Sequence, residues 1–125
     1  MPTTLHSIAI FVTDLERARI FYEETLDLPL HLQGAFGFQF LDQAPHLGVH
    51  PATHPDARAM VGRHTGITLA RENLLAFCVT LSEKHVTFVA EPTQQGFGIM
   101  AMVADPDGNV LALWEDNVTE TGDDA

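Results

Sequence analysis

Near the start of the chain, apolar side chains recur at every second position. Ile8, Ile10 and Val12 share one face of the stretch that begins at Ser7. A period of two is typical of a strand with one buried face. We therefore predict a strand over 7–12, with its apolar face packed against a helix.

A helical period follows at once. Thr13-Asp-Leu-Glu16 has the pattern of a capping box, with Thr13 as the N-cap and Glu16 reaching back to it. Pro29 cannot continue a helix, so the predicted helix runs from about Asp14 to 25 or 26. Its apolar stripe comprises Leu15, Ala18, Phe21, Tyr22 and Thr25.

Three short apolar stretches come next, over 28–32, 36–40 and 47–50, separated by turn residues. They predict a three-stranded meander. The stretch 51–63 contains prolines and glycine without a clear period, and we interpret it as a connecting loop.

The same order begins again 57 residues later, with a strand predicted over 64–70. A helix over 72–84 follows, with Leu74, Leu75, Cys78 and Leu81 as its stripe; a buried strand over 74–81 is the alternative. Strands are then predicted over 86–90, 98–104 and 110–115. The last two are joined by the turn Asp105-Pro-Asp-Gly-Asn109, where Gly and Asn favour positive φ.

This repeat predicts an α+β fold of two tandem βαβββ modules, over about 5–50 and 64–115. Together they would form a curved mixed sheet around a cavity, with helices on the outer face. With 125 residues, 46% of them hydrophobic, the chain is long enough for one domain. We expect that domain to span 1–118, followed by an acidic tail over 119–125.

Charge and cysteine content narrow the choice of partners and compartment. The net charge of −11 repels nucleic acid and anionic membrane surfaces. The single cysteine, Cys78, cannot form an internal disulfide, and we expect a buried thiol. The first residues do not resemble a signal peptide, and the longest apolar stretch, 74–79, is too short to span a bilayer. A cytoplasmic protein is therefore expected.

Strand alternation indicates which side chains would line the cavity. Because the inward positions are mostly small, a pocket with Phe11 and Trp114 as aromatic walls and His64 as a polar anchor should remain. Aromatic side chains filling the cavity, or a second chain covering this face, are the alternatives. The predicted pocket residues are Ser7, Ala9, Phe11, Phe38, His50, His64, Gly66, Thr68, Ala112 and Trp114.

Three motifs resemble landmarks of the vicinal oxygen chelate superfamily, which includes glyoxalases, bleomycin resistance proteins and extradiol dioxygenases. They are Val12-Thr-Asp-Leu-Glu-Arg-Ala-Arg-Ile-Phe-Tyr22, Leu26-Asp-Leu-Pro-Leu30 and Asp105-Pro-Asp-Gly-Asn109. The similarity extends over 5–115 and implies the two-module fold. It also implies a homodimer, because related proteins commonly dimerise.

The resemblance also implies where metal-dependent relatives hold a divalent ion. The first-strand and last-strand ligand positions correspond to Ser7 and Ala112, neither of which is a normal ligand, whereas His64 matches the fifth-strand position. We therefore favour no cofactor. A displaced set for Zn, Ni, Mn or Fe would comprise His6, His50, His64 and Glu115, and would need bulges that turn His6 and Glu115 inward.

Three functions follow from these patterns. The first is a metal-free protein that binds a small, partly aromatic or apolar molecule. The second is a metal-dependent lyase, isomerase, dioxygenase or thiol transferase, so enzymatic activity stays open. The third is a fold kept for dimerisation or protein contact alone.

Overall fold

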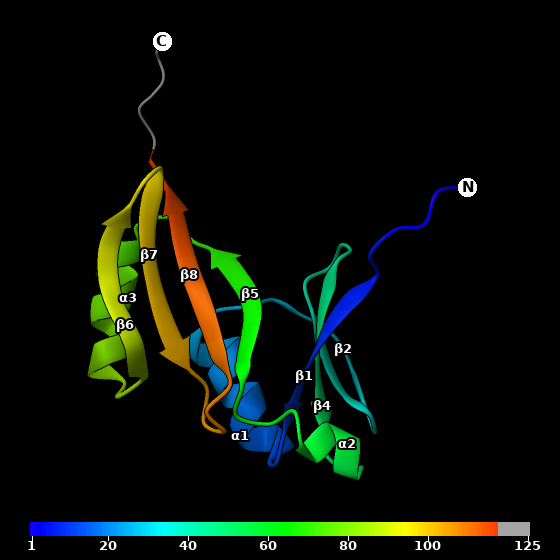
Figure 1. Cartoon of the computed structure of the whole chain (residues 1–125). Helices are drawn as coiled ribbons and strands as arrows, with labels where there is room; N and C mark the ends of the chain where they lie inside the picture. The colour runs from blue at the N-terminus through cyan, green and yellow to red at the C-terminus, as the bar shows by residue number, and fades with distance from the viewer. Residues whose placement is uncertain (118–125) are drawn as a thin grey trace. The chain divides into compact units, whose positions relative to one another are not determined.

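The computed structural model describes residues 1–117, so the predicted acidic tail, 119–125, lies outside the described residues. The chain forms two compact units. The first comprises 1–63 together with 106–109, and the second comprises 64–105 and the chain from 110 onward. Each unit contains one four-stranded mixed sheet (Figure 1). The α+β class and the two βαβββ modules are confirmed; a cavity shared by the modules stays a prediction.

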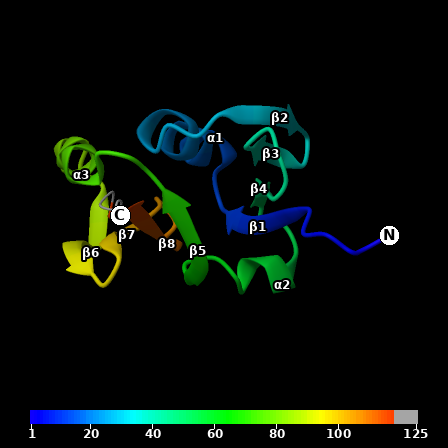
Figure 2. The ribbon, with the colours of Figure 1, turned by 90° about the horizontal axis from the view of Figure 1, so that it is seen from above.

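The first unit has the strand order β1-β4-β3-β2 (Figure 2). Strand β1 runs parallel to β4, whereas β2, β3 and β4 form the predicted antiparallel meander. The elements are β1 (Ser7–Val12), α1 (Leu15–Arg19), η1 (Ile20–Thr25), β2 (Leu30–Gly34), β3 (Gly37–Phe40), β4 (His46–Pro51) and α2 (Pro55–Arg58).

The first helix begins one residue later than the capping box predicts. Asp14, not Thr13, is the N-cap, and its Oδ1 accepts the N–H of Arg17 at 3.0 Å. Glu16 does not reach back either, because its carboxylate pairs with Arg19 at 2.6 Å. A second acceptor far along the chain, Asp107, takes the Thr13 hydroxyl, and local spacing could not reveal it.

The helix then widens into the π-helix η1, where the N–H of Leu26 donates to the carbonyl of Phe21 at 2.8 Å. It ends at Thr25, as predicted. Phe21 and Tyr22 are both buried and their rings meet edge to face at 5.1 Å. The smaller rotation per residue of a π-helix lets these neighbouring rings both face the core.

The covered face of the first sheet holds the core of this unit. Ile10 and Val12 are buried as predicted, together with Leu47 and Val49 of β4. Ile8, which the alternation also assigns to this face, is 37% exposed. This expectation was wrong because the buried part of β1 begins only at Ile10, and Ile8 lies nearer the N-terminal end of the strand.

The predicted loop over 51–63 contains the one-turn helix α2. The Nδ1 of His54 caps it by accepting the N–H of Asp56 at 3.1 Å, and Pro55 occupies its first turn. Proline is favoured there because its missing N–H would have had no partner inside the helix. The unpatterned sequence gave no periodic signal for so short an element.

The turn Asp105-Pro-Asp-Gly-Asn109 fastens the first unit. Gly108 has φ of +86°, in agreement with the predicted turn. The buried Asn109 donates from Nδ2 to the carbonyl of Phe11 at 3.0 Å and accepts the N–H of Gly62 at 2.8 Å. Asp107 accepts both the N–H and the hydroxyl of Thr13, at 2.9 and 2.6 Å. This motif therefore has a structural role.

The second unit has the strand order β5-β8-β7-β6, with β5 parallel to β8 and the other pairs antiparallel. Helix α3 covers one face of this sheet (Figure 1). None of the helices within residues 1–117 has the length and apolarity needed to cross a bilayer. The elements are β5 (His64–Ala70), α3 (Leu74–Glu83), β6 (Thr87–Gln95), β7 (Gly98–Ala104) and β8 (Val110–Asp116).

The second predicted helix is confirmed as α3, and the alternative of a buried strand over 74–81 is wrong. Leu74, Cys78 and Leu81 form its buried stripe, and burial raises the pKa of the Cys78 thiol. Leu75 is 56% exposed, so its assignment to the stripe was wrong. The helix starts two residues later than predicted because Asn73 adopts a left-handed conformation, with φ of +54°.

Candidate functional site

The second sheet has one face covered by α3, and no described helix of the second unit lies on its opposite face. Leu111 and Leu113 of β8 are buried on the covered face, as the alternation predicts. Ala112 and Trp114 lie on the other face, where the parallel pairing sets them beside Thr68 and Ala70 of β5. We call this second surface the open face of the second unit.

The indole of Trp114 is held in place on the open face. Its Nε1 donates to Oδ1 of Asp116, two residues further along the same strand, at 2.8 Å. A Cβ atom at Gly98 on the neighbouring strand would collide with the indole ring and would stand 2.5 Å from the Glu115 carbonyl. Glycine at 98 therefore lets the ring approach β7 closely.

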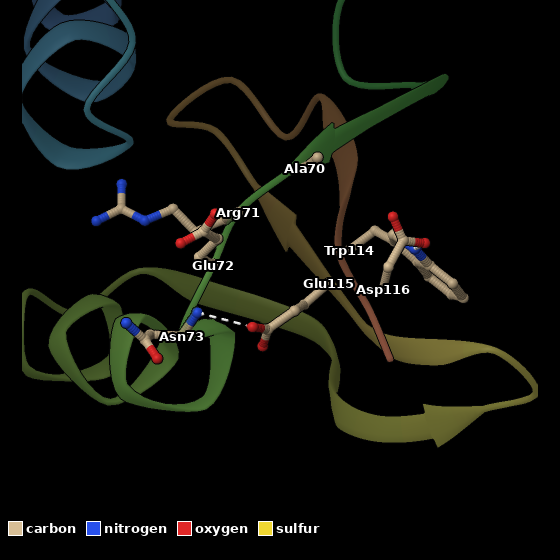
Figure 3. Close-up of a pocket in the computed structure, with 7 residues that line it drawn as sticks. All are labelled: Ala70, Arg71, Glu72, Asn73, Trp114, Glu115 and Asp116. Carbon is tan, nitrogen blue, oxygen red and sulfur yellow. Dashed lines mark hydrogen bonds between the residues drawn. The ribbon is translucent and has the colours of Figure 1, made fainter. Parts of the chain in front are cut away.

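Trp114 forms part of the wall of a pocket of about 630 Å³ at the carboxyl ends of β5 and β8. Figure 3 shows Trp114 and Asp116 together on one side of the strand ends and Arg71 on the other. Of the predicted pocket residues, only Trp114 lines it. The lining residues are Ala70, Arg71, Glu72, Asn73, Trp114, Glu115 and Asp116.

Glu115 caps helix α3 from the neighbouring strand. Its two carboxylate oxygens accept the N–H groups of Asn73 and Leu74, at 2.9 and 3.0 Å. Figure 3 shows the bond from Asn73. These amides lie at the positive end of the helix and need acceptors. Glu115 is therefore committed to the covered side of the sheet, as its parity predicts.

Arg71 is also committed within the second unit. Its guanidinium carbon lies 3.8 Å from the centre of the Phe77 ring on α3, a cation–π contact. Its backbone N–H donates to the Trp114 carbonyl at 2.8 Å, which fixes the end of β5 against β8. The side chain thus points toward the helix layer.

His64 lies at the far end of the β5–β8 pair. It pairs with Val110, and Trp114 is four residues further along β8, or roughly 13 Å at the usual strand rise. The register shifts between His64 and Thr68, and Gly66 in this irregular stretch has φ of +75°. The structure therefore brings Thr68 and Ala112 to the face of Trp114, but not His64 to its pocket.

The first sheet also has an open face. Ala9 and Phe11 on β1 lie beside Gly48 and His50 on β4, and the Phe11 and His50 rings are 6.1 Å apart. A Cβ atom at Gly48 would stand 2.5 Å from the His50 Nε2, so the imidazole covers this glycine. Ser7 lies further along the same face of β1.

Phe38 lies on the covered face of the first sheet. It pairs with the buried Val49, and its ring is 6.3 Å from that of Phe40. The structure therefore does not bring Phe38 to the face of Phe11 and His50. The short strand β3 was too brief for its sequence to fix which phenylalanines face the helix.

The displaced metal-ligand set does not converge within either unit. His6 lies beside His46, with ring centres 5.3 Å apart, and His50 is four residues further along β4, roughly 13 Å away. His64 and Glu115 lie at opposite ends of the β5–β8 pair. Within each unit of residues 1–117, no three His, Cys, Asp or Glu side chains could hold an ion.

Sequence reasoning missed most of the pocket at the carboxyl ends of β5 and β8. Asp116 could have been predicted as a pocket residue, because strand alternation sets it on the same face as Trp114. Glu72 and Asn73 were harder to assign, because the helix predicted over 72–84 included the loop that precedes α3. Arg71 lies between the predicted strand and that helix, where the pattern gives its side chain no role.

Comparison with known proteins agrees with this fold. A structure from Sphaerobacter thermophilus DSM 20745, described as a member of the glyoxalase/bleomycin resistance protein/dioxygenase superfamily, is 27% identical. It covers 92% of this chain and 98% of its own, with a TM-score of 0.75. TnmS3, an antibiotic binding protein from Streptomyces sp. CB03234, is 27% identical over 93% of this chain and 98% of its own, with a TM-score of 0.73.

Lactoylglutathione lyase from Agrobacterium tumefaciens is 15% identical and shares the fold, with a TM-score of 0.68 over 92% of this chain and 95% of its own. Among curated proteins, no match to the chain is found. The model of the Glyoxalase/Bleomycin resistance protein/Dioxygenase superfamily matches residues 4–113. The chain therefore belongs to this superfamily.

Proposed function

We propose that the protein binds a small, partly aromatic or apolar molecule against Trp114. The observation that carries this proposal is the indole fixed between Gly98 and Asp116 at the wall of an open pocket. A ring that is already positioned loses little conformational freedom on binding, so its contact area contributes efficiently to affinity.

The similarity to TnmS3 supports this class of function. That protein is described as antibiotic binding and is 27% identical to this chain across nearly its whole length. A glyoxalase/bleomycin resistance protein from the same Streptomyces strain is 26% identical, with a TM-score of 0.65. We infer that the present chain likewise holds a drug-sized organic molecule.

We further propose that binding requires no metal ion. Ser7 and Ala112 are poor ligands for a divalent cation, and the Glu115 carboxylate already caps α3. No observation favours a metal-dependent enzyme over a binding protein. We also propose that the protein forms a homodimer, because Leu75 and Val79 form an exposed apolar strip on α3. A cytoplasmic location is proposed because the single Cys78 cannot form an internal disulfide.

Trp114 is the only tryptophan, so its fluorescence reports directly on the pocket. We expect titration with anthracenylmethanol, a neutral polycyclic probe, to quench this fluorescence saturably, with and without a chelator. Calorimetry on Trp114→Leu should show binding weakened by about fivefold or more, because a stacked ring contributes roughly 1–3 kcal/mol. The matched control is Phe36→Leu, which removes an exposed ring that does not line the pocket.

Two outcomes would contradict the proposal. If the probe binds Trp114→Leu as tightly as the natural protein, the indole is not part of the site. If a chelator abolishes binding and elemental analysis finds about one transition metal per chain, the metal-dependent alternative is correct. Light scattering at several concentrations tests the dimer separately.

A further inference from the structure

The charges around the Trp114 pocket are unbalanced. Three carboxylates, those of Glu72, Glu115 and Asp116, line it together with one guanidinium, that of Arg71. The whole chain carries a net charge of −11, which adds a long-range attraction for cations. Which of these charged groups already have partners within the protein determines whether the pocket would attract a cationic or an anionic ligand.

The groups that would attract an anion are already occupied. The N-terminal amides of α3 are a usual anion site, but both oxygens of Glu115 accept hydrogen bonds from them. The guanidinium of Arg71 lies over the Phe77 ring, on the opposite side of the strand ends from Trp114 (Figure 3). An anionic ligand would have to displace one of these contacts.

Asp116, by contrast, is exposed and lies at the indole itself. Its Oδ1 accepts the indole N–H at 2.8 Å. A carboxylate has about four lone-pair sites, so Asp116 can accept a further donor while it holds the ring. A hydrogen bond from the indole N–H to a carboxylate also increases electron density in the ring, which strengthens attraction for a cation on its face.

From these contacts we propose that the pocket selects aromatic molecules that carry a protonated amine. The aromatic ring would pack against Trp114, and the ammonium would lie over or beside the indole, within reach of the Asp116 carboxylate. This inference rests on the proposed function and adds the charge class of the ligand. Arg71 and Glu115 keep their contacts with α3 and remain outside the recognition step.

Three probes with one ring system isolate the charge: anthracenylmethylamine, anthracenylmethanol and anthracene carboxylate. We expect calorimetry at low salt to give an affinity for the ammonium probe about fivefold to tenfold higher than for the alcohol. The carboxylate probe should bind most weakly. Added sodium chloride should weaken binding of the ammonium probe while leaving the alcohol nearly unchanged.

The decisive variant is Asp116→Asn, whose amide oxygen still accepts the indole N–H. We expect the preference for the ammonium probe to fall to within about twofold of the alcohol, whose affinity should not change. Glu83→Gln is the matched control, since it removes the same charge from the far, exposed end of α3. Far-ultraviolet circular dichroism verifies that each variant is folded.

The outcomes separate this inference from the proposed function. If all three probes bind equally, or the alcohol binds best, the charge preference is wrong and the binding function stands. If none of the probes binds the natural protein, both are wrong. If Glu83→Gln loses the preference as fully as Asp116→Asn, net charge accounts for it and Asp116 has no local role.

Discussion

Asp107 should contribute more to stability than any surface carboxylate of the first unit. Its side chain is only 8% exposed, and its two oxygens accept the N–H and the hydroxyl of Thr13, at 2.9 and 2.6 Å. Removing the carboxylate leaves both Thr13 donors without this acceptor at the corner between β1 and α1. Arg17, 3.3 Å away but 51% exposed, adds little.

The expected cost follows from these contacts. A hydrogen bond to a charged group is worth about 1.5–3 kcal/mol, and the two bonds share one partner residue. We therefore expect Asp107→Ala to lower the free energy of unfolding by about 3 kcal/mol. Asp107→Asn keeps one acceptor oxygen and should cost about half as much. Asp56→Ala, at a side chain 96% exposed, should change stability by less than about 0.5 kcal/mol.

Urea unfolding followed by circular dichroism measures these differences, provided that the m-values agree between variants. A double-mutant cycle with Thr13→Val isolates the hydroxyl contact. If the two substitutions are additive, or if Asp107→Ala costs no more than Asp56→Ala, then the turn does not clamp the first unit and the reasoning fails.

Three further predictions concern the second unit. Glu115→Ala should lower the free energy of unfolding by about 1–2 kcal/mol, because the first amides of α3 lose their cap; urea unfolding beside Glu83→Ala tests it. Gly98→Ala should be destabilising by about 1–3 kcal/mol and should shift the Trp114 emission, since a methyl group there collides with the indole; unchanged emission would contradict this. Burial raises the pKa of the Cys78 thiol above its ordinary value of 9.0, so the folded state keeps this proton to a higher pH than the unfolded state does. The free energy of unfolding should therefore fall as the pH rises through about 9. Cys78→Ala should reduce the slope of unfolding free energy against pH, and equal slopes in the two proteins would refute the prediction.

The sequence predicted the architecture well because period and repeat are local properties. Every predicted strand and both predicted helices exist, since Ile10, Val12, Leu74 and Cys78 face the core as their spacing requires. The predictions were wrong at positions where a residue far along the chain determines the local structure. The N-cap moved from Thr13 to Asp14 because of an acceptor 94 residues away along the chain.

The pocket was less predictable for the same reason. Trp114 could be assigned to the open face by alternation, but nothing in the sequence near it signals that Gly98 makes room for its ring. The irregular stretch between His64 and Thr68 also breaks the strict period, and no local rule fixes where a parallel pair shifts register. The site therefore depends on strand pairing, which one sequence does not reveal.

The two sheets share one structural feature on their open faces, but the chemical groups around it differ. On each open face an aromatic side chain covers a glycine: His50 covers Gly48 in the first unit, and Trp114 covers Gly98 in the second. The imidazole is tied to the Phe36 carbonyl at 2.8 Å, whereas the indole is tied to the Asp116 carboxylate, also at 2.8 Å. The first ring therefore has a neutral partner, whereas the partner of the second carries a negative charge. Under the charge preference proposed for the Trp114 pocket, this difference in ring partner would give the two modules different ligand preferences without altering the strands that carry them.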